Sequence, residues 1–343
     1  MPELIYKTVS KTSKVYIGIP WTDVSQFIDI EKTVIITDNN VKGIYGNKFP
    51  DCTVLVVKAG EASKNLSTVE SLLKQLLRHG VDRSWFILGI GGGVVSDIAG
   101  FVASIYMRGI GFGFISTSLL SQVDASIGGK NGVNLDNTKN VVGCFEQPDF
   151  VICDPEMLKT LPDDEYFSGL GELVKHAIIR DSDLFKLIEL NTEGILNRNP
   201  ELMANLVMRS VSIKKQIVET DERETGIRRL LNFGHTLGHA AESLWNMKHG
   251  YAVTYGMLMA AHLSVAEGFL DEKSLERIEN LFSVLNLTVE AKNIDKKFIN
   301  IMKKDKKREG DLIHFVYLKG IGEGIIKPTQ VGMMVRKIKG NSL

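Results

Sequence analysis

Histidines gather in one short stretch of the chain and are the residues best suited to hold a metal ion. Four of the seven histidines lie close together: His235, His239, His249 and His262. His235 and His239 are four residues apart, so they share one face of a helix. The segment HTLGH lacks the glutamate of HExxH, which argues against a zinc protease. Spacing alone selects His235 and His239 as a Zn²⁺ pair with a distant carboxylate, while ordinary surface histidines are the alternative.

Two glycine-rich segments are candidates for binding phosphate groups. GIGGGVVSD (residues 89–97) follows a strand pattern and opens a helix, where free backbone amides attract phosphate. It departs from GxGxxG, so a tight strand-to-helix turn explains it equally well. SIGGK (residues 126–130) is not a P-loop, because GxxxxGK[ST] is absent. Both a phosphate-binding loop and a solvated loop fit this second segment, which runs into Asn131, Asn134, Lys139 and Asn140.

Two runs of charged residues lie in the second half of the chain. They are residues 221–224, followed by Arg228 and Arg229, and residues 304–307. Such runs are usually solvated helix faces, and the alternative is that some members bind an anionic substrate.

Composition excludes several classes of protein. The 343 residues, with 44% hydrophobic and 24% charged, indicate one large or two ordinary globular domains. Lysine plus arginine and aspartate plus glutamate balance at 41 each, which argues against a nucleic-acid partner. Three cysteines without CxxC spacing favour a reducing cytoplasm. No secretory signal and no apolar stretch of about 18 residues is visible, so we expect a cytoplasmic protein without a membrane partner.

The elements that must position these residues change character along the chain. Strands are expected at 14–19, 33–37, 53–58, 85–90 and 112–116, with helices at 67–79 and 94–107. This alternation predicts a mostly parallel sheet with helices on both faces.

From residue 163 onward the periodicity is almost entirely helical. Helices are expected at 166–179, 183–190, 200–220, 230–245, 252–267 and 272–285, followed by a hairpin of 312–318 and 324–327. Asp163 is the expected N-cap of the first of these helices. The sequence therefore predicts an α/β domain (residues 1–162) and a mostly helical domain (163–343), with a substrate cleft between them.

Taken together, the ordered motifs resemble bacterial 3-dehydroquinate synthases, members of the sugar phosphate cyclase superfamily. The resemblance is carried by GIGGGVVSDIAGF, STSLLSQVDASIGGKNGVN, TKNVVGCFEQP, LKTLP, GLGELVKHA, DERETGIRRLLNFGHTLGHA, HGYAV and KKDKK. It implies an N-terminal Rossmann-like parallel-sheet domain, a mostly helical C-terminal domain, an active site between them and a homodimer.

The resemblance also implies a reaction. It is a phosphate-eliminating carbon–oxygen lyase reaction of the shikimate pathway, which supplies aromatic amino acids. The sugar acid phosphate 3-deoxy-D-arabino-heptulosonate 7-phosphate becomes 3-dehydroquinate and phosphate. NAD⁺ transiently oxidises the C5 hydroxyl and thereby acidifies the C6 hydrogen. Elimination, re-reduction, ring opening and an intramolecular aldol step follow. The implied cofactors are NAD and Zn²⁺, for which Co²⁺ can substitute.

The family's functional residues map onto this chain position by position. The implied metal ligands are Glu172, His235 and His249, and His239 becomes a proton relay instead of a ligand. The other implied catalytic residues are Asp124, Lys175 and Glu224. The implied substrate contacts are Lys214, Arg228 and Asn232 at the carboxylate, and Lys130, Asn140, Lys306 and Arg108 at the phosphate, with Arg108 from this chain or its partner. The implied NAD contacts are Asp38, Asn40, Glu61, Lys64, Gly92, Gly93, Val94, Asp97, Thr117, Ser118, Lys130, Lys139, Thr160, Leu161 and Glu165.

Four positions depart from the family pattern. Ser118 stands where threonine is usual, Ala125 where serine is common, and Asn131 where threonine is common. Tyr251 replaces the usual glutamate of HGE and is expected to change the surroundings of His249. None of these departures removes an implied ligand or substrate-binding charge.

Three other functions compete with this interpretation. Another sugar phosphate cyclase would act on sedoheptulose 7-phosphate or glucose 6-phosphate, which lack the carboxylate that Lys214, Arg228 and Asn232 would bind. A metal- and NAD-dependent polyol dehydrogenase would release net NADH. A non-enzymatic nucleotide-binding module would leave the metal and anion residues without a purpose.

Overall fold

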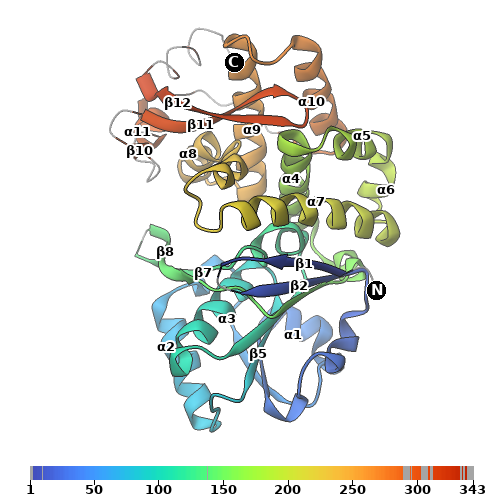
Figure 1. Cartoon of the computed structure of the whole chain (residues 1–343), viewed down its shortest axis with the longest axis vertical. Helices are drawn as coiled ribbons and strands as arrows, with labels where there is room; N and C mark the ends of the chain where they lie inside the picture. Colours follow the sequence, from blue (N-terminus) through green and yellow to red (C-terminus); the bar gives the residue numbers. More distant parts are fainter. Residues whose placement is uncertain are drawn as a thin grey trace. The chain divides into compact units, whose positions relative to one another are not determined.

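The chain forms two compact units, each of which is described by itself below (Figure 1). The structure is a computed structural model. It describes residues 3–288 apart from Ser10 and Asn137, together with 294, 296–302, 308–309, 312–332, 334 and 337. Unit 1 comprises Met1–Leu161 and Met203–Glu222, and unit 2 comprises Pro162–Leu202 and Arg223–Leu343. The sequence had predicted a single boundary after residue 162. The structure differs in grouping residues 203–222, which lie beyond that boundary, with the first unit.

Unit 1 is built on a seven-stranded sheet. The strands lie in the order β1 (Glu3–Lys7), β2 (Thr12–Ile17), β9 (Phe150–Cys153), β6 (Gly111–Ser116), β5 (Phe86–Gly91), β3 (Thr33–Asp38) and β4 (Thr53–Val57). Only the β1–β2 pair is antiparallel, while the other neighbours run parallel. The predicted Rossmann-like parallel sheet is thus confirmed. Its central strands are continuous apolar runs because both faces are covered.

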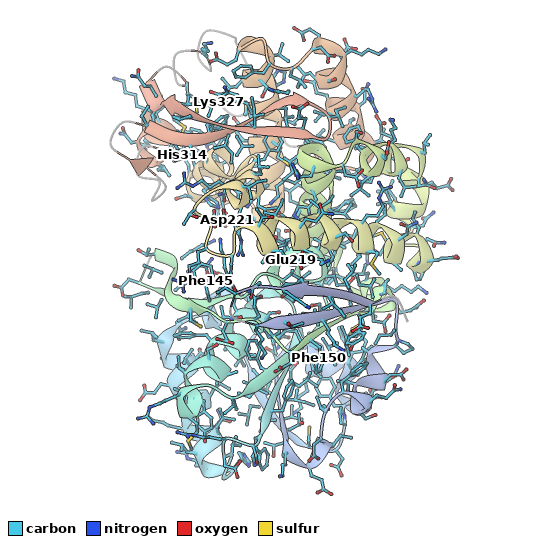
Figure 2. All side chains as sticks on the ribbon, in the orientation of Figure 1. Phe145, Phe150, Glu219, Asp221, His314 and Lys327 are labelled. Atoms are coloured by element: carbon cyan, nitrogen blue, oxygen red, sulfur yellow. The ribbon has the colours of Figure 1, made fainter. Side chains whose placement is uncertain are left out.

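Helices and aromatic side chains close this core. The α-helices of unit 1 are α1 (Asn39–Tyr45), α2 (Leu66–Arg78), α3 (Gly93–Ile105) and the greater part of α7 (Pro200–Thr220). Phe150, labelled in Figure 2, stacks on Phe86 with ring centroids 5.7 Å apart. Helix α3 packs against β5, β6 and β7, so its residues are apolar nearly all round. It ends before the predicted residue 107, because Met107 and Arg108 have φ angles of 51° and 68°.

The GGK segment opens a hairpin, which corrects the expectation of a polar loop. Strand β7 (Lys130–Leu135) pairs antiparallel with β8 (Thr138–Phe145), whose last residue is labelled in Figure 2. Asparagine and glycine are poor strand formers, which is why sequence pattern missed both strands. Asp136 has a φ of 49°, as tight hairpin turns require.

Unit 2 is mainly helical, as predicted. Its helices are α4 (Asp163–Arg180), α5 (Ser182–Leu190), α6 (Thr192–Leu196), the start of α7 (Pro200–Thr220), α8 (His235–Trp245), α9 (His249–Ala266), α10 (Glu272–Val284) and α11 (Lys296–Met302). A small antiparallel sheet of β10 (Arg308–Glu309), β11 (Leu312–Gly320) and β12 (Glu323–Gln330) contains the predicted hairpin, with His314 of β11 and Lys327 of β12 labelled in Figure 2. In the described part of the chain, we find no helix with the length and apolar character needed to cross a membrane.

Two local predictions in unit 2 are wrong. The single helix expected at 230–245 is split into a short 3₁₀ turn, Ile227–Asn232, and α8. Gly234 between them has a φ of 78°, a left-handed conformation that stops the first turn. The N-cap of α4 is Pro162, since its carbonyl already accepts from the amides of Glu165 and Tyr166. Asp163 therefore lies in the first helical turn.

Helices α8 and α9 approach each other closely at Gly256. A Cβ atom built on Gly256 would lie 1.9 Å from the carbonyl oxygen of Gly234. A backbone atom cannot move aside as a flexible side chain can, so glycine is required at this crossing. The crossing holds together the two helices that carry the clustered histidines.

We predict that Gly256→Ala lowers the free energy of unfolding by about 3 kcal/mol, because the methyl group overpacks a backbone contact. The control is Gly43→Ala in α1, where a Cβ would meet no atom of the described residues within 4 Å. Alanine there favours the helix by about 0.5–1 kcal/mol. Denaturant unfolding followed by circular dichroism measures both variants. A Gly256→Ala protein as stable as its parent would show that the crossing is loose.

Candidate functional site

A buried ion pair on α4 lies at the centre of unit 2's candidate site. Glu172 and Lys175 are one helical turn apart, and each side chain is 1% exposed. The Lys175 ammonium donates to Glu172 Oε2, which satisfies one carboxylate oxygen. A buried carboxylate needs compensation of this kind, because removing it from water is costly.

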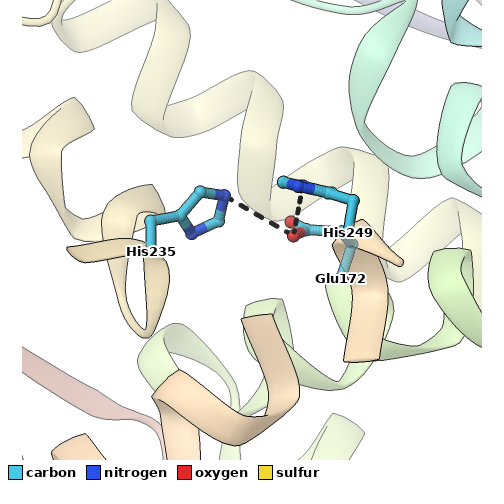
Figure 3. Close-up of side chains that lie close together, drawn as sticks. All are labelled: Glu172, His235 and His249. Carbon is cyan, nitrogen blue, oxygen red and sulfur yellow. Dashed lines mark ion pairs between the residues drawn. The ribbon is translucent and has the colours of Figure 1, made fainter. Parts of the chain in front are cut away.

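The other oxygen of Glu172 faces two imidazoles. Oε1 lies 3.7 Å from His235 Nε2 and 3.9 Å from His249 Nε2, as the dashed lines in Figure 3 show. It is buried and accepts no hydrogen bond from the described residues. The two distances exceed hydrogen-bond length but approach the separation of about 3.3 Å between ligands on one tetrahedral Zn²⁺. An orphaned acceptor facing two nitrogen atoms fits a cation bound among these three atoms.

The remaining ring nitrogens fix which atoms face Glu172. His235 Nδ1 lies 3.2 Å from the carbonyl oxygen of Phe233, and His249 Nδ1 lies 3.1 Å from Glu242 Oε2. Both partners are acceptors, so these hydrogen bonds assign the proton of each neutral ring to Nδ1. The Nε2 lone pairs are then available toward Glu172, which is the usual arrangement of histidines that ligate a metal.

The charge around His249 is negative. Burial lowers its pKa, but the hydrogen bond to Glu242 and the charges of Glu172 and Glu242 outweigh burial and raise it. Two carboxylates beside one imidazole therefore favour a positive charge here, carried either by a protonated His249 ring or by a bound cation.

The histidine pair selected by spacing is not the set that encloses Glu172. His235 and His239 do lie close, with ring centroids 5.3 Å apart, but His239 is exposed. Among the described residues of unit 2, two metal-capable groups overlap: Glu172, His235 and His249, and His239, Glu242 and His249. The first contains the buried oxygen to which no described residue donates, so it is the better candidate. Periodicity within one helix could not find His249, because that residue begins the next helix.

In unit 1, candidate nucleotide residues follow the ends of adjacent parallel strands. Asp38 ends β3, Gly92 follows β5 and Ser118 lies just after β6. Carboxyl ends of neighbouring parallel strands meet at one sheet edge, where α/β proteins bind ligands. A Cβ on Gly92 would lie 3.2 Å from Ser118 Oγ, so these two turns adjoin. Asp38 also caps α1 by accepting from the amides of Asn40 and Val41.

A second ion pair on this unit joins the buried Lys64 to the half-buried Asp97. Burial raises the pKa of Asp97 to about 6, although the charge of Lys64 opposes the shift. Unfolded, the same carboxyl ionises near 3.8. The folded state therefore binds more protons between about pH 4 and 6, and this group's contribution to folding stability becomes less favourable as pH rises through that range.

Polar links join the β7–β8 hairpin to the segment before α2. Asn134 Nδ2 donates to Glu61 Oε1 at 2.8 Å, and the amide of Asn140 donates to Asn134 Oδ1 at 2.9 Å. Glu61, an implied NAD contact, and Asn140, an implied phosphate contact, are therefore connected through one side chain. Asn134, which the family mapping did not select, is the connecting residue.

Asp124 and Lys214 are neighbours within unit 1. The buried Lys214 ammonium donates to both the side chain and the backbone carbonyl of Asp124, each at 2.5 Å. The family resemblance implies separate roles for them, with Asp124 as a catalytic residue and Lys214 as a contact of the substrate carboxylate. Their contact means that any group that binds one of them changes the charge environment of the other.

In unit 2, a further pair lies next to the implied carboxylate site. Asn232 Nδ2 donates to Glu224 Oε1 at 2.5 Å. Arg228, on the 3₁₀ turn that ends at Asn232, is 2% exposed. A buried guanidinium is suited to bind a carboxylate, because it is always charged and offers five donors.

The remaining expected residues are more scattered. Lys130 and Lys139 are exposed on the hairpin, Arg108 is exposed after α3, and Glu165 is exposed in the first turn of α4. Thr160 Oγ1 lies 2.5 Å from the hydroxyl of Tyr45. Gly93 and Val94 begin α3, Thr117 is buried after β6, and Leu161 is half-buried before α4. Lys306 lies outside the described residues.

Models of two protein-family domains match most of the chain. The 3-dehydroquinate synthase N-terminal model matches residues 54–168, and the C-terminal model of the same family matches residues 169–308. The chain belongs to the 3-dehydroquinate synthase family. A curated 3-dehydroquinate synthase from Dehalococcoides mccartyi is 43% identical over 310 residues, which cover 87% of this chain and 86% of that relative. The expected activity, a phosphate-eliminating lyase reaction that makes 3-dehydroquinate, is thereby confirmed.

Solved structures of sugar phosphate cyclases share the fold. A 2-epi-5-epi-valiolone synthase from Streptomyces hygroscopicus subsp. jinggangensis, with NAD⁺ and Zn²⁺ bound, has a TM-score of 0.86 at 26% identity, covering 98% of both chains. A 2-deoxy-scyllo-inosose synthase complexed with carbaglucose-6-phosphate, NAD⁺ and Co²⁺ also has a TM-score of 0.86, at 23% identity and covering 99% and 100%. The second likeness concerns the fold alone.

Positions that depart from the 3-dehydroquinate synthase pattern have local explanations. The buried Asn131 donates to the carbonyls of Gly129 and Glu146, and so holds the GGK turn. Ala125 lies against the start of α3: a Cβ atom built on Gly93 would be 3.1 Å from the Cβ of Ala125. Ser118 keeps a hydroxyl that bonds Ser121 at 3.1 Å.

We predict that Lys64→Met raises the pKa of Asp97 above about 6, because the variant removes the positive charge that opposes burial. Carbon-13 NMR titration of the side-chain carboxyl measures this pKa, and the signal is assigned to Asp97 by its loss in Asp97→Asn. Lys74→Met is the control, since Lys74 pairs with the exposed Glu70 and should leave Asp97 unchanged. An unchanged or lower value in Lys64→Met would contradict the ion pair's role.

Proposed function

We propose that this chain converts 3-deoxy-D-arabino-heptulosonate 7-phosphate into 3-dehydroquinate with NAD and a divalent metal held by Glu172, His235 and His249. The single observation that carries the metal assignment is the buried Oε1 of Glu172 facing two Nε2 atoms. The valiolone synthase, solved with NAD⁺ and Zn²⁺, supports the choice of cofactors.

When bound, NAD⁺ would accept and return a hydride, and the metal would polarise substrate hydroxyls. The chain's own residues prepare the site for this. Lys175 neutralises one oxygen of Glu172, which leaves the other as a directed ligand atom. His239 is exposed next to His235 and His249. It can therefore exchange protons with solvent while the Nε2 atoms of His235 and His249 stay directed at Glu172.

An acidic substrate is favoured by the charges assigned to it. Arg228 is a buried guanidinium. Asn232 donates a hydrogen bond to Glu224, which lies four residues before Arg228 in the chain. Lys214 is a buried ammonium held by Asp124. A carboxylate on the substrate matches the geometry of the Arg228 guanidinium, and this match favours an acidic sugar phosphate over the sugar phosphates without a carboxylate on which other cyclases act.

Nucleotide binding in unit 1 rests on the strand ends and on α3. Helix α3 begins at Gly93 and has Gly92 as its N-cap, without a side-chain cap. Its first amides are therefore available to a pyrophosphate, which the helix N-terminus also attracts electrostatically. One turn further along α3, the half-buried Asp97 pairs with the buried ammonium of Lys64, so the two side chains supply an acceptor and a donor near this helix end.

We further propose a homodimer in the cytoplasm. Apolar side chains exposed at the end of α3 and on the β7–β8 hairpin support a second copy as the partner: Ile105, Met107, Leu135, Val141 and Phe145. Arg108 adjoins this surface, which fits its implied role across a dimer. Cys52, Cys144 and Cys153 are free thiols, as a reducing compartment favours.

We predict phosphate release from the heptulosonate phosphate that requires NAD⁺ in catalytic amount and accumulates no NADH, because the hydride is returned in each cycle. Phosphate release and NADH absorbance are followed together, with sedoheptulose 7-phosphate as the control substrate. NADH that grows in step with product would instead favour the polyol dehydrogenase. Equal turnover of the sedoheptulose phosphate would favour another cyclase.

A second experiment separates the two metal assignments. His249→Ala should lose most bound zinc, since a three-ligand site reduced to two binds weakly. His239→Ala should keep its zinc but lose turnover by about 10²–10⁴-fold, as expected for a proton relay. Metal analysis of both variants and the parent at equal protein concentration decides between them. Zinc retained in His249→Ala at the parent's level would refute this ligand set.

A further inference from the structure

Glu242 is a half-buried carboxylate that the family mapping did not select. Helix α8 presents His235, His239 and Glu242 at positions i, i+4 and i+7, which fall on one face. The Glu242 side chain is 16% exposed, and its Oε2 lies 3.1 Å from His249 Nδ1. Glu242 thus contacts an implied metal ligand that belongs to the neighbouring helix, α9, and not to α8.

The turn between α8 and α9 creates this contact. Helix α8 ends at Trp245, Asn246 follows with a left-handed φ of 51°, and α9 begins at His249. The chain reverses over three residues, so the first turn of α9 lies beside the last turns of α8. The close approach at Gly256 keeps the two helices together.

We propose that Glu242 is the positioning residue that holds the His249 ring with Nε2 toward Glu172 Oε1. This inference rests on the metal assignment proposed above. The hydrogen bond uses the Nδ1 proton, so it selects the tautomer whose lone pair is on Nε2 and also fixes the ring's rotation. His235 obtains the same selection from a backbone carbonyl. His249, the first residue of its helix, depends on a side chain for it.

The geometry distinguishes positioning from direct ligation. Glu242 lies at hydrogen-bond distance from Nδ1, whereas Glu172 Oε1 lies beyond that distance from Nε2 of the same ring. One nitrogen therefore carries a proton toward Glu242, while the other faces the orphaned oxygen. Tyr251, where the family usually has glutamate, does not replace Glu242, because its electrostatic neighbours are Asp164, Lys248 and Asp163.

The test measures zinc affinity of the full-length protein by competition with a chelating dye. Glu242→Ala should weaken zinc binding about 10–100-fold and keep one zinc per chain, as loss of an outer hydrogen bond to a ligand does. Glu242→Gln should recover much of the affinity, since its amide oxygen can accept the same N–H. Glu279→Ala is the matched control: Glu279 bonds His262 Nε2 at 3.0 Å, away from the candidate ligands, and should bind zinc like the parent.

Co²⁺-loaded protein provides a second measurement. Glu242→Ala should change the visible spectrum through a loosened His249, and Glu242→Gln should return it toward the parent's. Parent affinity in Glu242→Ala would overturn the inference. It would also be overturned if Glu242→Gln bound zinc no better than Glu242→Ala and both matched Glu172→Ala, which would make Glu242 a ligand.

The outcomes separate this inference from the assignment on which it rests. If the parent binds no zinc, or Glu172→Ala binds it as tightly as the parent, the metal assignment itself fails, and the inference fails with it. If Glu172→Ala and His249→Ala lose zinc while Glu242→Ala does not, only the inference fails.

Discussion

The carboxylate of Glu172 is the constraint around which unit 2 is organised. A carboxylate with 1% exposure is tolerable only when positive or donor groups surround it. Lys175, one turn away on α4, meets part of this need, and two imidazoles from α8 and α9 face the rest. Three helices must therefore converge on one oxygen atom, which explains why glycines stand where these helices cross. At Gly250, next to His249, a Cβ would lie 2.2 Å from the Cα of Ser168 on α4.

Unit 1 uses buried charge in a similar way at the edge of its sheet. Lys64 pairs with Asp97 on α3, and Lys214 pairs with Asp124. Burial raises the pKa of Asp97 to about 6 even though the Lys64 ammonium opposes this shift, so the ion pair offsets only part of the cost of burying the carboxylate. Such pairs add little net stability, so their position beside the strand ends is better explained by binding than by folding.

Sequence periodicity predicted the parts of the fold whose apolar spacing is regular. Strands β2 to β6, helices α2 and α7 and the β11–β12 hairpin follow their patterns closely, whereas strand β1 and the parallel strand β9 were not predicted. The β7–β8 hairpin and the break at Gly234 were missed, because asparagine- and glycine-rich strands have weak propensity and one left-handed glycine leaves no periodic signal. For the site, spacing within a helix found His235 and His239, and the same rule extended to i+7 would have found Glu242. Glu172 and His249 come from other helices, so only the family resemblance identified them.

Tyr251 shows how the chain tolerates a departure next to its candidate ligands. Two residues along α9 rotate a side chain by about 200°, so position 251 points away from the direction of His249. It lies near Asp164 and Asp163 at the start of α4. Burial, and to a lesser degree the charge of Asp164, raise the pKa of the Tyr251 phenol, which is therefore neutral at physiological pH. A glutamate here would add a third negative charge beside two aspartates, with Lys248 already paired to Asp164. Tyrosine avoids that repulsion, and His249 keeps its hydrogen bond because Glu242 accepts it from α8.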